Sequence, residues 1–163
     1  MENTHTTYVR NFIFGVEDSL VSTVGLLSGI AVAGTETNTI ILAGIVLIFV
    51  EAFSMGTGSL LSEHSAQQID LHKEVSFKKS LKSGGVMFVS YFIAGFIPLA
   101  PYILLSAPYA LPTSIVLSLS ALLLLGASSG EMAGIRITRP ALQMFFIGGV
   151  AVLLGAFVGM IFT

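Results

Sequence analysis

Five long apolar runs, separated by short polar connections, dominate the pattern along the chain. Each run has about 20 residues, enough for a helix to cross a hydrocarbon core of about 30 Å. The pattern therefore predicts an all-α fold, in which residues 1–163 form a single five-helix transmembrane domain. The predicted spans cover residues 12–34, 40–62, 84–106, 111–129 and 141–162, and residues 63–83 form a short cytoplasmic connection between the second and third spans.

The composition agrees with a membrane protein. Of 163 residues, 54% are hydrophobic and 10% are charged, whereas globular domains carry about 25% charged residues. A net charge of −2 argues against a nucleic-acid partner. The absence of cysteine excludes disulfides, thiolate metal sites and cysteine catalysis. Tryptophan is also absent, so anchoring at the membrane surface is expected from phenylalanines and from Tyr8, Tyr91, Tyr102 and Tyr109.

The positions of the basic residues predict the orientation in the membrane. All seven precede the first span or lie between spans two and three or spans four and five: Arg10, Lys73, Lys78, Lys79, Lys82, Arg136 and Arg139. The positive-inside rule makes these segments cytoplasmic, with the N-terminus inside and the C-terminus outside. The first span is expected to be retained, because a cleaved signal would hold Glu17 and Asp18 in its apolar core. The membrane would be the plasma membrane of a prokaryote, or a vacuolar or other organelle membrane of a eukaryote.

Small residues and prolines predict helix contacts. Glycines repeat every four residues at 126, 130 and 134 and again at 155 and 159, a spacing that lets helix backbones approach closely in lipid. Pro98 and Pro101 are expected to kink the third span, and packing alone can account for both.

Three acids fall inside the apolar runs, namely Glu17, Asp18 and Glu51. Ionised carboxylates at these places would cost roughly 8–10 kcal/mol together, less near a membrane face or in a wet cavity. Since nothing structural requires them, we expect a polar site for a cation between helices. The alternative for Asp18 and Glu51 is a buried hydrogen bond or a proton site. Glu17 points about 100° away from Asp18 and could simply reach lipid headgroups.

Helical spacing gathers these acids with other polar or small residues. The first span has one such face and the second another: Asp18, Ser22, Gly25 and Gly29, and Glu51, Ser54, Met55, Gly58 and Ser62. Counted from the cytoplasmic ends of their spans, Asp18 and Met55 lie at nearly the same depth, about 10 Å. The spacing therefore predicts a ladder in which Asp18 faces Met55 and Glu51 lies near Ser22.

Carboxylates combined with a thioether favour particular metals. Oxygen ligands alone suit Mg²⁺, Ca²⁺ or Mn²⁺, whereas sulfur shifts the preference toward later transition metals. The predicted metal ligands Asp18, Met55 and Glu51 fit Fe²⁺ or Mn²⁺, with Asp18 and Glu51 exchanging protons. Methionine also fills gaps in cores, so Met55 has a packing interpretation as well.

Three ordered motifs resemble the vacuolar iron transporter family. Residues 15–29 begin Gly-Val-Glu-Asp-Ser-Leu and are similar to the family's Gly-Leu-x-Asp-Gly-Leu motif; residues 52–61 contain its Ala-x-Ser-Met-Gly-x-Gly stretch; residues 95–102 match Gly-x-x-Pro-Leu-x-Pro-Tyr. The resemblance implies five-helix subunits that form a homodimer with a metal path between the copies. It also implies export of Fe²⁺, and often Mn²⁺, from the cytoplasm by proton exchange, and it matches Asp18 and Met55 to the family's metal positions.

The chain departs from the family pattern in two places. The family's long, Glu-rich cytoplasmic metal-binding region is missing, because only residues 63–83 lie between spans two and three. The family's membrane Glu precedes Met by about two turns, where this chain has Leu47, whereas Glu51 is one turn from Met55. The first departure affects metal capture, and the second affects the geometry of the ladder.

The short connection could compensate for the missing region. If span two continues as a helix, one face carries Glu63, Gln67, Asp70 and Glu74, with His64 and His72 close by. Glu63, His64, Asp70 and Glu74, with Glu17, are therefore candidates for a metal-collecting vestibule. The alternative is a solvated helix end with lysines at the lipid surface.

These features favour a transporter over an enzyme. No Ser/His pairing and no His-Glu-x-x-His motif falls within a span. No permanently bound cofactor is expected, and Fe²⁺ or Mn²⁺ is the substrate; the other partners are membrane lipid and a second copy of the chain. Two alternatives stay open: a non-transporting membrane subunit that binds or senses metal, and a transporter of a different substrate on the same scaffold.

Overall fold

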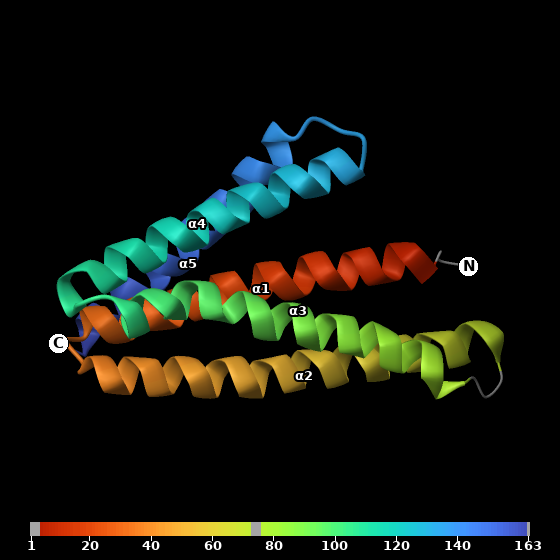
Figure 1. The fold of residues 1–163 in the computed structure, drawn as a ribbon. Coiled ribbons are helices and arrows are strands. Elements are labelled where there is room, and N and C mark those ends of the chain that lie inside the picture. The colour runs from red at the N-terminus through yellow and green to blue at the C-terminus, as the bar shows by residue number, and fades with distance from the viewer. Residues whose placement is uncertain (1–3, 73–75, 163) are drawn as a thin grey trace.

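The computed structural model describes residues 4–72 and 76–162, and within them the chain is a bundle of helices (Figure 1). Each helix is long and apolar enough to cross a membrane, which confirms the predicted all-α transmembrane class. The helices are α1 (Thr4–Val32), α2 (Thr37–Leu71), α3 (Phe77–Leu104), α4 (Ala107–Met132) and α5 (Thr138–Ile161). Their outward faces are rich in exposed Leu, Ile, Val and Phe, as expected for surfaces in contact with lipid.

The second and third helices extend beyond the spans that hydropathy predicts. α2 continues to Leu71 and α3 begins at Phe77, so most of the described part of the 63–83 connection is helical. Residues 62–71 contain neither Gly nor Pro, so nothing stops the helix where its apolar run ends. α2 finally ends at His72, whose φ of 49° is left-handed. Hydropathy marks the length in lipid, whereas backbone hydrogen bonding decides the length of the helix.

The basic residues gather at one end of the bundle. The N-terminal end of α1, the α2–α3 connection and the α4–α5 connection lie at this end, and the C-terminus lies at the other (Figure 1). Six of the seven Lys and Arg residues lie at this end, in the first half of α1, the first turns of α3 and α5 or the α4–α5 connection, and Lys73 falls outside the described residues. We call this the basic end. The arrangement agrees with five spans and one basic face.

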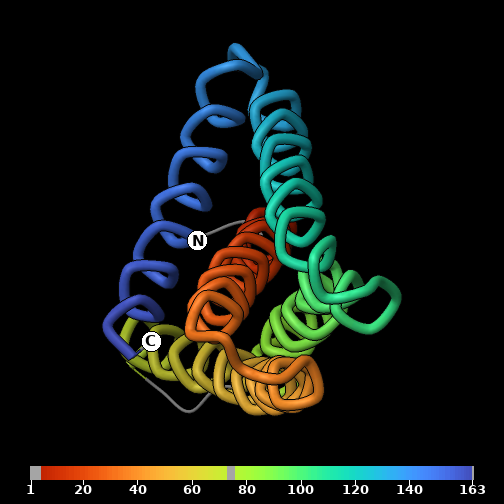
Figure 2. Tube along the Cα trace, turned by 90° about the vertical axis from the view of Figure 1, so that its left-hand side faces the viewer, coloured from red at the N-terminus to blue at the C-terminus, as the bar shows by residue number. Residues whose placement is uncertain are grey.

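α3 is the central helix of the structure. It packs against α1, α2 and α4, and its contacts with α1 and α2 are more extensive than those that α1 and α2 make with each other. Both prolines of α3 are buried, and the Ser114 hydroxyl of α4 donates to the Pro98 carbonyl at 2.6 Å. The α4–α5 hairpin lies across α1 and diverges from it toward the basic end (Figures 1 and 2).

Glycines lie at the closest helix contacts, as the spacing predicts. A Cβ on Gly155 would fall on the carbonyl oxygen of Gly25, and one on Gly159 would fall on that of Gly29. Gly126 and Gly130 similarly face the start of α5. The prediction is wrong for Gly134, which makes no such contact and follows α4 with a φ of +66°. There the glycine is needed for the turn and not for packing.

Candidate functional site

Two of the three membrane acids come together between α1 and α2. Asp18 and Glu51 are both half-buried, and their carboxyl groups are close enough for their charges to interact. The side chain of Tyr91 in α3 is fully buried and lies close enough to both carboxyl groups to interact with them electrostatically. Its hydroxyl lies 2.7 Å from the Ser22 hydroxyl. Three helices therefore contribute polar groups to one place within the bundle.

Tyr91 is the site residue that the sequence does not reveal. A tyrosine in a chain without Trp is expected at the membrane surface, but this expectation is wrong for Tyr91 and Tyr102, which are 0% and 4% exposed. Both lie on the side of α3 that packs against other helices: Tyr91 bonds to Ser22 of α1, and Tyr102 belongs to a core cluster with Leu27 and Ile40. Ser19 fixes Tyr91 further by donating to its carbonyl oxygen at 2.6 Å. Tyr109, at 66% exposure, keeps the predicted anchoring position.

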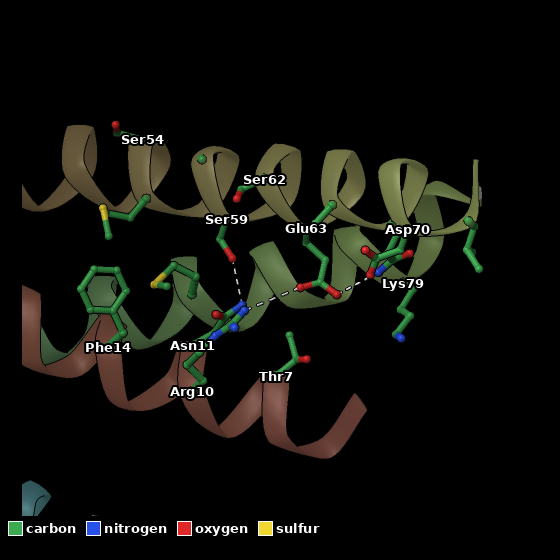
Figure 3. A pocket seen from close by; sticks show the side chains of 16 residues that line it. Thr7, Arg10, Asn11, Phe14, Ser54, Ser59, Ser62, Glu63, Asp70 and Lys79 are labelled. Carbon is green, nitrogen blue, oxygen red and sulfur yellow. Dashed lines mark hydrogen bonds and ion pairs between the residues drawn. The ribbon is translucent and has the colours of Figure 1, made fainter. Parts of the chain in front are cut away.

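A cavity of about 1450 Å³, lined by both polar and apolar side chains, opens at the basic end between α1 and α2. α1 and α2 form its walls, and Lys79 and Met87 of α3 complete its lining. Met55 lines this cavity together with Glu63 and Asp70, and Figure 3 shows the two acids on α2. Met55 lies within the apolar run of α2, whereas Glu63 and Asp70 line the cavity because α2 continues as a helix past the end of that run. The structure thus places the predicted sulfur ligand Met55 and two of the predicted vestibule acids along one wall.

Hydrogen bonds and an ion pair join the walls of this cavity. Asn11 of α1 donates to Ser59 of α2 at 2.8 Å and to the Ser83 hydroxyl of α3 at 2.6 Å. Arg10 forms an ion pair with Glu63 at 3.8 Å, and Gln67 donates to the same carboxylate at 2.8 Å (Figure 3). The sequence contained a signal for Asn11, since it lies two turns before Asp18 on the same face of α1.

The two predicted faces do not meet along their whole length. Gly25 and Gly29 turn toward Ala151 and Gly155 of α5, so the C-terminal part of the predicted face on α1 is a packing surface. Ser22 pairs with Tyr91, as described above. On α2, by contrast, four of the five predicted residues line the cavity, namely Ser54, Met55, Gly58 and Ser62, whereas Glu51 does not.

The other candidates fall in different surroundings. Asp18 and Glu51 are not among the residues that line the cavity of Met55. Glu17 lines a separate cavity of about 890 Å³ beside α5. The ring of His64 lies 5.1 Å from that of Phe77. Glu74 lies outside the described residues. Within residues 4–72 and 76–162, no three His, Asp or Glu side chains gather into a cluster that could hold a metal.

The fold and the positions of the acidic residues define the class of membrane protein. The described residues form a bundle of helices long and apolar enough to cross a membrane, with the half-buried acids Asp18 and Glu51 on α1 and α2 and a separate cavity at the basic end. The protein is therefore a polytopic integral membrane protein with acidic side chains inside its spanning helices.

Comparison with known sequences identifies the family. The sequence model of the VIT family matches residues 9–76 and 64–160, and the chain belongs to this family. It is 25% identical to vacuolar iron transporter 1 of Arabidopsis thaliana, over 88% of this chain and 81% of that protein. It is also 24% identical to vacuolar iron transporter 2 of Oryza sativa subsp. japonica, over 88% and 82% of the two chains.

The alignments also concern the connection between α2 and α3, where the family's cytoplasmic metal-binding region is expected. The alignment to the Arabidopsis relative spans 203 positions, more than the 163 residues of this chain, so the relative contains residues that this chain lacks. The two matched segments of the family model overlap at residues 64–76. An interruption there is consistent with a shortened connection between α2 and α3.

Proposed function

We propose that this protein moves Fe²⁺, with Mn²⁺ as a second substrate, out of the cytoplasm in exchange for protons. The coarser part, a metal transporter of the VIT family, follows from the family match. The observation that supports the finer part is that the acids Asp18 and Glu51, on two different helices, are close enough for their charges to interact, while Met55 lines the cavity at the basic end. Carboxylates inside spanning helices are costly and mark ion or proton sites, and two of them close together can bind either a dication or protons.

The cavity at the basic end is the proposed route of capture. The positive-inside rule makes the basic end cytoplasmic, so Glu63 and Asp70 would meet metal first and Met55 would meet it next. Fe²⁺ is soft enough to accept a thioether but still prefers carboxylate oxygens, which suits passage from Met55 to Asp18. The vestibule would partly replace the metal-binding region that the family resemblance implies and this chain lacks.

A homodimer completes the proposed site. One subunit supplies Asp18, Glu51 and Met55, but Met55 lies in a cavity that the two acids do not line. A second copy across the α1–α2 side would bring a further set of the same ligands to the path. The two-copy arrangement implied by the family resemblance supplies the coordination that a single subunit does not.

Metal flux into proteoliposomes tests the proposal. We expect Asp18→Ala and Met55→Ala to abolish Fe²⁺ uptake driven by a pH gradient, while helicity and monodispersity stay unchanged. Glu131→Ala and Met132→Ala are matched controls, because both residues are exposed at the end of α4 and line neither cavity described above. The controls should transport as the wild-type protein does.

The same assay separates the alternatives. Wild-type flux from both Asp18→Ala and Met55→Ala would end the proposal. Metal binding by the wild-type protein without flux would favour a sensing or binding subunit. Flux of another cation or of an organic solute in place of Fe²⁺ would show a different substrate. Anomalous density from a soaked metal ion beside Asp18 and Met55 would locate the site directly.

A further inference from the structure

The second cavity, of about 890 Å³, lies on the flank of the bundle between α1 and the first turns of α5. It shares no lining residue with the cavity of Met55. Most of its lining is apolar and includes Leu142, Phe146 and Ile147, which are all exposed. Its charged residues are one acid and one base, Glu17 and Arg139.

The register of α1 against α5 sets the depths of these two charges. Gly25 faces Ala151 and Gly29 faces Gly155, so the two helices run parallel. Continued toward the basic end, the same register places Glu17 level with Gln143, which also lines the cavity. Arg139 is one turn nearer the membrane face, about 6 Å. Side chains lean toward the N-terminus of a helix, so both charged groups lean toward this face.

The acid and the base lack protein partners that would neutralise them. In the described part of the chain, neither Glu17 nor Arg139 has an ion-pair or hydrogen-bond partner. An unpaired carboxylate one turn inside the membrane is costly. A ligand that brings a cation to Glu17 and an anion to Arg139, and that also covers an apolar wall, would remove this cost.

We propose that this groove binds the headgroup of phosphatidylethanolamine. The primary ammonium donates hydrogen bonds to Glu17, the phosphate accepts from Arg139, and an acyl chain lies along Phe146 and Ile147. The flexible two-carbon arm of ethanolamine lets the ammonium fold back beside the phosphate. Other lipids fit less well: choline has no N–H to donate, glycerol has no cation, and serine adds a carboxylate beside Glu17.

Lipid competition on the full-length protein tests this site. Purified protein is equilibrated with equal amounts of phosphatidylethanolamine and phosphatidylcholine that have identical acyl chains, and the retained lipids are counted by mass spectrometry. We expect the wild-type protein to favour phosphatidylethanolamine about two- to five-fold, the ratio that a partly exposed ion pair supplies. Stepwise methylation of the ammonium should reduce retention at each step.

Variants of Glu17 and Arg139 show which part of the headgroup each residue binds. Glu17→Gln should retain both lipids equally, because it removes the partner of the ammonium. Arg139→Gln should lower retention of both, since both lipids carry the phosphate. Arg136→Gln is the matched control, because Arg136 is equally basic and exposed but does not line the cavity, and it should behave as the wild-type protein does.

Three results would overturn the proposal. The first is equal retention of the two lipids by the wild-type protein. This measurement tests the proposal even if a variant fails to fold. The second is an unchanged preference in Glu17→Gln. The third is efficient cross-linking of a Gln143→Cys variant between two copies, which would show that a second subunit covers the groove.

Discussion

The contact between α1 and α5 leads to a prediction in which one substitution has opposite effects at two positions of a single helix. In Gly155→Ala, the new methyl group would fall on the carbonyl oxygen of Gly25, and backbone atoms on both sides prevent a local adjustment. The helices must separate, which also loosens the neighbouring contact of Gly159 with Gly29. Overpacking of this kind costs about 1–3 kcal/mol.

Gly149 in the same helix provides the matched position. A Cβ there meets nothing within 4 Å, so Gly149→Ala should gain the helix propensity of alanine, about 0.5–1 kcal/mol. The same methyl group is therefore expected to destabilise the protein at position 155 and to stabilise it at position 149.

Thermal unfolding in a fixed detergent measures both effects. Because the chain has no Trp, helicity by circular dichroism is the appropriate signal. We expect the midpoint of Gly155→Ala to fall by about 2–12 °C and that of Gly149→Ala to rise. If both midpoints move in the same direction by similar amounts, the close approach of α1 and α5 is wrong.

Two further predictions concern polar contacts between helices. Tyr91→Phe leaves Ser22 without its 2.7 Å partner and should cost about 0.5–1.5 kcal/mol of stability. We also expect this variant to transport Fe²⁺ more slowly. Tyr109→Phe, at an exposed site, should match the wild-type protein in both measurements. Asn11→Ala removes the bonds to Ser59 and Ser83 and should cost about 1–3 kcal/mol in the same unfolding assay. Equal effects from Asn11→Ala and from Asn38→Ala, at an exposed position, would contradict the proposed role of Asn11.

The sequence by itself determined the spans, their number and the shared end of the basic residues. In lipid, each crossing segment must satisfy its own backbone hydrogen bonds, so an apolar run of sufficient length becomes a helix regardless of its neighbours. The glycine spacing likewise identified contacts at Gly126, Gly130, Gly155 and Gly159, because only small residues permit that approach. The ordered motifs were enough to identify the family.

The tertiary structure decided which polar groups meet. Periodicity places Asp18 and Ser22 on one face of α1, but the rotation and central position of α3 bring Tyr91 to Ser22 and keep its ring away from lipid. The packing of α1 and α2 likewise forms the cavity that Met55 lines, whereas Glu17, next to Asp18 in the chain, faces a different cavity beside α5. Spacing along one helix fixes a direction from that helix only, and the partner found in that direction depends on how all the helices pack.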